Sequence, residues 1–173
     1  MIKIFILFIL LVSQAIASDC GFRVHRAEVD QTGFTQNNYS QVFFPSESPD
    51  SYYNAAGFDL GGRFANSLWV PVPVGGAARM VGFGGQIWIT DGASAPGLGP
   101  YYVARIIKNG WPGGISIGAA IAAKGAFSND WVITLSMHDY AQAGDSYGVY
   151  LFTTSSITVN GISLHTWWDG VCL

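Results

Sequence analysis

Apolar and polar residues alternate over short stretches of this chain, and the clearest alternation runs from Trp131 to His138. Trp131, Ile133, Leu135 and Met137 fall at every second position, and mostly polar residues separate them. A period of two places these sets on opposite faces of an extended segment. We therefore predict a half-buried β-strand over residues 131–138.

Three other segments have the residue types of strands. Residues 86–90 and 101–107 are rich in β-branched and aromatic side chains, and the second runs into Asn109-Gly110. That pair tolerates the positive backbone angles of a tight hairpin turn. Residues 70–74 are also extended, but two prolines remove amide donors, so we expect them at a sheet edge or over a bend.

The segment from Tyr147 to Phe152 differs because both of its faces are apolar. Tyr147, Val149 and Leu151 share one face, and Tyr150 and Phe152 share the other. Two explanations stay open: the second face packs against a partner chain, or the protein's own loops cover it. Under the first explanation, the aromatic residues Tyr147, Tyr150 and Phe152 are the candidate interface.

No segment keeps a helical period over ten residues. Residues 115–124 come nearest, but they contain Gly118 and end at Gly125. Turn-forming Gly, Pro, Asn and Asp recur throughout, a spacing typical of many short antiparallel strands. The pattern therefore predicts an all-β sandwich.

Composition narrows the class of protein further. Of 173 residues, 50% are hydrophobic, 14% aromatic and only 11% charged. Such a chain is too apolar for disorder or a coiled coil, and its length suits one folded domain. The net charge of −3 gives no electrostatic reason to bind nucleic acid or anionic lipid.

The N-terminus has the form of a signal peptide. A lysine at position 3 precedes an apolar run over residues 4–12, and Ala15-Ile16-Ala17 is an A-x-A cleavage site. The run is too short for a stable membrane anchor. We expect residues 1–17 to be removed, leaving a secreted domain of residues 18–173 with no membrane insertion.

Cys20 and Cys172 are the only two cysteines, and they lie near the ends of the mature chain. A metal site or a redox pair needs close spacing or further ligands that the sequence does not supply. An exported chain permits disulfides, so we predict that the two cysteines pair. This pairing requires both ends of the chain to meet.

Five short segments follow one another in a recognisable order. They are Phe22-Arg23-Val24; Phe58-Asp59-Leu60-Gly61-Gly62-Arg63-Phe64 with Val70-Pro71-Val72-Pro73-Val74-Gly75-Gly76; Lys108-Asn109-Gly110; Ala143-Gly144-Asp145 leading into Tyr147 to Phe152; and His165-Thr166-Trp167-Trp168-Asp169-Gly170-Val171-Cys172-Leu173. This order resembles the globular head of the C1q and tumour-necrosis-factor superfamily, which are secreted jelly rolls that assemble as trimers.

The resemblance implies a jelly-roll β-sandwich of about ten antiparallel strands, with its first and last strands side by side. It also implies a homotrimer, with the strand over 147–152 near the threefold axis, and a non-enzymatic recognition or adhesion role. A glycan or protein ligand would bind through the loops. No collagen-like Gly-x-y stretch precedes the head, so we expect a stalkless member. The alternative role is that of a structural subunit in an extracellular assembly or lattice.

One motif raises the alternative of a serine hydrolase. Gly114-Ile115-Ser116-Ile117-Gly118 matches the G-x-S-x-G nucleophile elbow, and Asp145 and His165 follow in the order of an α/β-hydrolase. The elbow needs a strand before the serine and a helix after it, and this stretch predicts no helix. We therefore expect no catalytic residues.

Metal binding has only weak candidates. Asp139 and Asp145, with His138 beside the first, offer two carboxylates, whereas calcium prefers six to eight oxygens. Calcium binding near the trimer axis does occur in the family that the chain resembles. We expect a solvated loop here and no cofactor.

Two residues are candidates for surface chemistry. Trp111 lies in a Gly- and Pro-rich loop, where it either stacks on a ligand or packs under its own hairpin. Asn38-Tyr39-Ser40 is an N-x-S acceptor for glycosylation if the host cell glycosylates exported chains.

Overall fold

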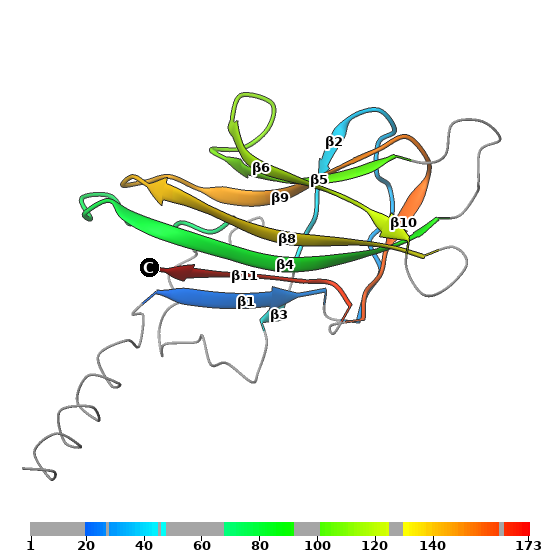
Figure 1. Ribbon diagram of the computed structural model, residues 1–173, viewed down its shortest axis with the longest axis horizontal. Coiled ribbons are helices and arrows are strands. Elements are labelled where there is room, and N and C mark those ends of the chain that lie inside the picture. Colours follow the sequence, from blue (N-terminus) through cyan, green and yellow to red (C-terminus); the bar gives the residue numbers. More distant parts are fainter. Residues whose placement is uncertain are drawn as a thin grey trace, which may run out of the picture.

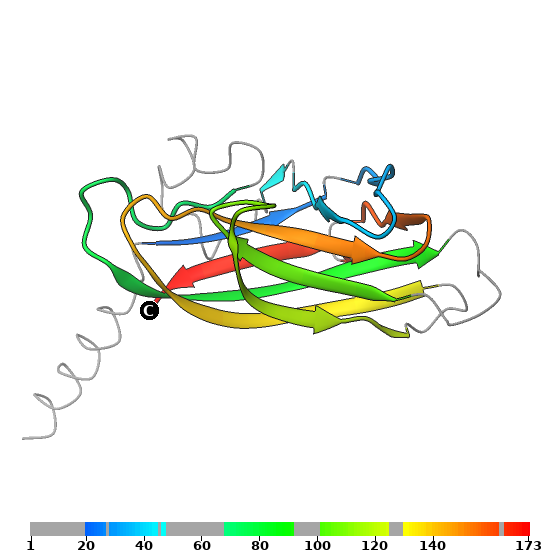
Figure 2. The same ribbon diagram turned by 90° about the horizontal axis from the view of Figure 1, so that it is seen from above.

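The computed structural model describes residues 20–26, 28–44, 46–47, 68–91, 101–124, 130–162 and 165–173. These residues form eleven strands in two antiparallel sheets, which lie one over the other as a sandwich (Figures 1 and 2). The all-β jelly-roll prediction is confirmed. The predicted signal peptide and the Phe58–Phe64 segment lie outside the described residues.

The larger sheet has the strand order β3-β1-β11-β4-β8-β7, and β10 pairs with β4 beside this path. Its strands are β1 (Gly21–His25), β3 (Ser46–Glu47), β4 (Arg79–Asp91), β7 (Ala123–Lys124), β8 (Asp130–Ala141), β10 (Ile157–Val159) and β11 (Trp167–Cys172). The long β4 and β8 pair along almost their whole length, from Arg79 opposite Ala141 to Thr90 opposite Asp130.

The smaller sheet has the strand order β2-β9-β5-β6. Its strands are β2 (Tyr39–Gln41), β5 (Tyr102–Lys108), β6 (Ile115–Ile121) and β9 (Tyr147–Thr153). In Figure 1 this sheet forms the upper layer, and β5 and β9 lie at its centre.

The predicted alternation over 131–138 is confirmed in β8, where Ile133 and Leu135 are buried and Thr134 and Ser136 are exposed. The strand predicted over 86–90 is only the second half of β4. Gly82, Gly84 and Gly85 interrupt the apolar pattern in its first half, so the sequence pattern alone did not reveal the full strand.

The hairpin at Asn109-Gly110 exists, but it is longer than the tight turn that the pair predicted. Asn109 and Gly110 have φ angles of 63° and 76°, and the loop continues through Gly114 before β6 begins. Residues 70–74 were predicted at a sheet edge or over a bend, and they lie outside the strands with a bend at Pro71 and Val72.

Aromatic rings fill the centre of the sandwich. The ring of Phe22 lies 4.7 Å from that of Trp69 and 4.7 Å from that of Trp168, and all three side chains are buried. Gly170 gives these rings their space, because a Cβ atom there would lie 2.3 Å from Cε1 of Phe22. This packing ties β1 and β11 to the segment that precedes β4.

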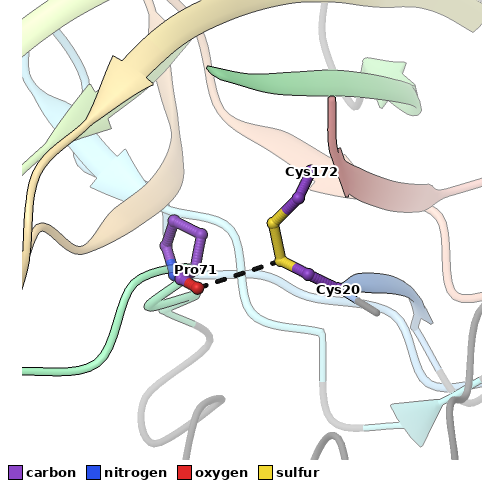
Figure 3. The surroundings of a disulfide bond; sticks show 3 residues. All are labelled: Cys20, Pro71 and Cys172. Atoms are coloured by element: carbon purple, nitrogen blue, oxygen red, sulfur yellow. Dashed lines mark hydrogen bonds between the residues drawn. A yellow bond between two sulfur atoms is a disulfide. The ribbon is translucent and has the colours of Figure 1, made fainter. Parts of the chain in front are cut away.

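The predicted disulfide between Cys20 and Cys172 is confirmed, and it joins the start of β1 to the end of β11 (Figure 3). The Cys20 sulfur also lies 3.8 Å from the carbonyl oxygen of Pro71. β1 and β11 pair antiparallel from Gly21 opposite Val171 to His25 opposite Trp167. The first and last strands are therefore neighbours, as the resemblance implied.

Candidate functional site

Four aromatic side chains meet on the outer face of the smaller sheet. The ring of Tyr39 lies 4.8 Å from that of Trp111 and 5.4 Å from that of Phe152, and the ring of Tyr101 lies 6.3 Å from that of Phe152. Trp111 is 41% exposed and Tyr101 is 48% exposed. We call Tyr39, Tyr101, Trp111 and Phe152 the aromatic surface cluster.

The loop over 109–114 brings Trp111 to this cluster because it folds back onto the sheet. A Cβ atom at Gly114 would lie 2.1 Å from the carbonyl oxygen of Gly110 and 2.8 Å from Cγ2 of Ile107. Only glycine permits so close an approach of the chain to itself. Ile107 points to the outer face, opposite to the core residue Ile106, yet it is fully buried beneath this loop.

The base of the loop is held by hydrogen bonds to the turn between β8 and β9. Asn109 donates its side-chain amide to Oδ1 of Asp145 at 3.0 Å, and its Oδ1 accepts from the backbone N–H of Ser146 at 3.0 Å. The backbone N–H of Asn109 also donates to the carbonyl of Ser146 at 2.7 Å. These bonds fix where the loop leaves β5.

An ion cluster lies beside this attachment, formed by Lys108, Asp139, Asp145 and Tyr147. The ammonium of Lys108 lies 2.7 Å from Asp145 Oδ2 and 3.1 Å from Asp139 Oδ2. Tyr147 donates its hydroxyl to the same oxygen of Asp139 at 2.8 Å. The three charged side chains are mostly shielded from water, so the cluster links β5, β8 and β9 electrostatically.

The pKa values follow from this geometry. Burial alone would raise the pKa of both carboxyls, but hydrogen bonds outweigh it and lower both: from Tyr147 and Lys108 to Asp139, and from Lys108 and the Gln142 backbone to Asp145. Burial acts in the opposite direction on Lys108, yet its bonds to the two carboxylates raise its pKa overall. Burial and the bond to Asp139 raise the pKa of Tyr147. All three ionic groups are therefore charged at neutral pH.

The three residues predicted at a trimer interface lie at different depths. Tyr147 is on the inner face and is fully buried in its own chain, so its ring belongs to the core. Tyr150 points outward but is only 8% exposed, and its hydroxyl would lie 3.9 Å from a Cβ atom at Gly110. Phe152 is half-buried under Tyr39 and Tyr101. The chain's own loop thus covers much of the second apolar face.

The residues of the hydrolase alternative do not come together. Ser116 lies inside β6, where its hydroxyl donates to the carbonyl of Gly118 at 3.3 Å, and a strand rather than a helix follows it. Asp145 is paired with Lys108, and the centre of the His165 ring lies 4.0 Å from that of Trp88 on the other sheet. The strand-turn-helix geometry of a nucleophile elbow is absent from this segment.

The weak calcium candidates have another role. Asp139 and Asp145 do lie near one another, but both hold the ammonium of Lys108. Among the described residues, no group of three or more His, Cys, Asp or Glu side chains is arranged to hold a metal ion. Likewise, no helix in this part of the chain is long and apolar enough to cross a membrane.

Asn38 is exposed in the turn before β2, and its Oδ1 accepts the backbone N–H of Tyr39 at 2.8 Å. The side chain of Ser40 accepts the backbone N–H of Thr35 at 3.2 Å. The N-x-S acceptor therefore lies directly beside the aromatic surface cluster.

A second surface feature was not found from the sequence. A groove of about 440 Å³ lies on the outer face of the larger sheet. Gly82 and Gly84 form part of its floor, and Met80, Asp169 and Leu173 are among its lining residues. A Cβ atom at Gly84 would lie 2.5 Å from Oδ1 of Asp169, so a side chain there would displace this carboxylate. The two glycines are the signal in the sequence that could have revealed this groove.

The comparisons with known proteins address the fold. No family model matches the sequence, and no curated protein matches it. Murine APRIL at pH 8.5 is similar in structure, with a TM-score of 0.57 and 10% identity over 89% of this chain and 98% of that chain. The Eiger TNF of S. frugiperda has a TM-score of 0.56 and 10% identity over 89% and 92% of the two chains.

The described residues therefore have the jelly-roll fold of these two structures. A more distant likeness is to the globular domain of zebrafish complement 1qA, with a TM-score of 0.45 and 13% identity over 87% and 94% of the two chains.

Proposed function

We propose that this protein is a secreted, non-enzymatic recognition module that binds a glycan or protein ligand through its aromatic surface cluster. The observation that carries the proposal is the exposure of Trp111 and Tyr101 at the outer face of the smaller sheet, next to the rings of Tyr39 and Phe152. Large aromatic side chains that are held in place but reach solvent are typical of binding surfaces.

Secretion is supported by two independent features. The first 17 residues have the pattern of a cleaved signal peptide, and the only two cysteines form a disulfide, which persists in oxidising compartments. A recognition role is also consistent with the absence of an elbow geometry at Ser116.

The proposal includes a homotrimer, as the resemblance implies. Phe152 is a candidate for the trimer interface and Trp111 is a candidate for ligand binding, and both rings contact Tyr39. A second copy that covered Phe152 would therefore also cover the ligand site, so the aromatic surface cluster cannot serve both purposes. We therefore assign the contact between copies to the groove on the larger sheet. Met80 is 37% exposed and Leu173 is 73% exposed at this groove, and covering them removes apolar surface from water.

A second candidate function is that of a subunit in an extracellular lattice. It is favoured by β6, an edge strand whose Ile115 and Ile121 are exposed. Open apolar edge strands are prone to pair with other chains. Ordered arrays of the purified protein under the electron microscope would favour this role, whereas separate trimers would favour the recognition module.

The recognition role is tested by applying the mature protein to a printed glycan array and to a panel of extracellular protein domains. We expect binding that is lost in Trp111→Ser and retained in Trp88→Ser, a matched substitution on the outer face of the other sheet. Binding that survives Trp111→Ser, or no binding at all by the wild-type protein, contradicts the proposal.

A further inference from the structure

Arg105 lies at the centre of the outer face of the smaller sheet. It is on β5, opposite Tyr150 of β9 and Ala119 of β6. Its guanidinium carbon lies 5.1 Å from the centre of the Tyr39 ring, which belongs to the aromatic surface cluster. The side chain is half-buried. A positive charge is therefore held against the ring that Trp111 and Phe152 both contact.

No acidic side chain of the described ranges forms an ion pair with this guanidinium, whereas Arg23 pairs with Asp169, and Lys108 pairs with Asp139 and Asp145. Arg105 Nε is buried and has no hydrogen-bond acceptor. Its neighbours across the sheet, Tyr150 and Ala119, are uncharged. A partly desolvated cation without a counter-ion favours an anionic ligand.

The rings around Arg105 restrict the chemistry of that ligand. Trp111 and Tyr101 expose broad apolar surfaces, on which the C–H groups of a sugar ring can stack. A nucleic acid needs several basic side chains along its backbone, whereas one arginine in a chain of net charge −3 offers a single anion site. A saccharide with an anionic group matches both the exposed aromatic rings and the single arginine.

We propose that Arg105, Trp111 and Tyr39 form a subsite for an acidic saccharide, in which a sugar ring stacks on the aromatic side chains and its carboxylate or sulfate pairs with the guanidinium. This inference rests on the proposed function and specifies the ligand class for the same surface. The planar guanidinium has a donor arrangement that matches either anion in two parallel hydrogen bonds.

Two hexasaccharides of matched size test the charge requirement by isothermal titration calorimetry. Hyaluronan hexasaccharide carries carboxylates, and chitohexaose is a neutral chain of N-acetylglucosamine. We expect wild-type protein to bind hyaluronan at least tenfold more tightly, and this preference to weaken as sodium chloride is raised from 50 to 500 mM. A heparin-derived hexasaccharide in the same assay distinguishes a sulfate preference from a carboxylate preference.

Variants separate this inference from the proposed function. Arg105→Gln should remove the preference for acidic saccharides, and Trp111→Ser should abolish binding of both kinds. Equal affinity for hyaluronan, heparin and chitohexaose, or binding of only an acidic peptide, overturns the inference and leaves the recognition role standing. If neither a saccharide nor a protein ligand binds, both the inference and the proposed recognition role are overturned. The salt titration uses wild-type protein, so the test holds even if Arg105→Gln fails to fold.

Discussion

The ammonium of Lys108 lies 2.7 Å from Oδ2 of Asp145, and this contact joins the end of β5 to the turn between β8 and β9. The same turn holds Asn109, from which the loop that carries Trp111 departs. A charge interaction beneath the surface thus supports the position of an aromatic side chain on the surface. Its strength has consequences both for stability and for binding.

Lys108→Met should lower the free energy of unfolding by about 2 kcal/mol, because it leaves two partly buried carboxylates without their cation. Lys108→Arg keeps the charge and should lose less. Urea denaturation followed by tryptophan fluorescence measures both. Equal stability of wild type and Lys108→Met contradicts a stabilising role for the ion cluster.

Acid should weaken the same cluster. Burial would raise the pKa of Asp139 and Asp145, but bonds from Tyr147, Lys108 and the Gln142 backbone lower them below the ordinary value. A lowered folded-state pKa adds stability above the unfolded-state value of about 3.9, and this is lost as pH falls through the lower folded-state values. Wild type should therefore lose more stability between pH 5 and pH 2 than Lys108→Met.

Asp169 should behave in the opposite way. Burial raises its pKa, although Arg23 and the backbone of Gly84 act against the shift. A raised folded-state pKa in an acid is unfavourable at neutral pH, and its contribution to stability improves as pH falls through the folded-state value. Asp169→Asn should leave the melting temperature at pH 7 unchanged or higher, whereas Asp145→Asn should lower it. A fall of equal size in both variants contradicts this contrast.

Gly170 should tolerate no side chain. A Cβ atom there would lie 2.3 Å from the Phe22 ring and 3.0 Å from that of Trp69, so Gly170→Ala overpacks the core and should cost about 1–3 kcal/mol. Gly113→Ala is the control, since its Cβ atom would have nothing within 4 Å. Thermal unfolding followed by circular dichroism should separate the two variants clearly. Equal melting temperatures would show that the core rings can move aside.

The disulfide should make the folded protein inert to thiol reagents. With Cys20 bonded to Cys172 across a separation of 152 residues, alkylation should label no cysteine before reduction and both after it. Non-reducing gels should show monomer. Reduction should lower the unfolding free energy by several kcal/mol, because a closed loop of this length restricts the unfolded chain. A disulfide-linked dimer on the gel argues against the intramolecular bond in solution.

Local patterns predicted much of the sandwich. The alternation in β8 could be predicted because one face of the strand is buried and the other is exposed to solvent. The disulfide followed from the two cysteines in a chain with the pattern of an exported protein. The first half of β4 could not be predicted, because Gly82 and Gly84 have no side chains and so give no pattern of buried and exposed faces. A Cβ atom at Gly84 would meet Asp169, and one at Gly82 would meet Val171 and Leu173, all distant in the sequence.

The candidate site was harder to predict because its parts come from separate segments. The sequence placed Trp111 in a loop and left its exposure open, and Tyr39 and Phe152 come together near it only through the pairing of β2 with β9. The close approach at Gly114 folds the loop onto the sheet, and no local pattern reports it. Tyr147 was predicted at an interface because it belongs to an aromatic strand, whereas its hydroxyl donates to Asp139 inside the protein.

The last prediction concerns the homotrimer and which face forms it. Gly82→Glu introduces a charge into the groove on the larger sheet, and its Cβ atom would lie in ordinary contact, 3.6 Å from side-chain atoms of Val171 and Leu173. The monomer fold should therefore accept it, while a second copy seated on the groove should not. Light scattering at micromolar concentration should show a trimer for wild type and a monomer for this variant.

Phe152→Glu tests the other face in the same measurement. If copies associate through the groove, this variant should remain trimeric, because Phe152 lies under Tyr39 and Tyr101 on the opposite layer of the sandwich. A monomeric Phe152→Glu beside a trimeric Gly82→Glu would return the interface to β9, as the two apolar faces of that strand first suggested. A wild-type protein that is monomeric in this measurement would contradict the homotrimer, and also the gain in avidity from three linked copies.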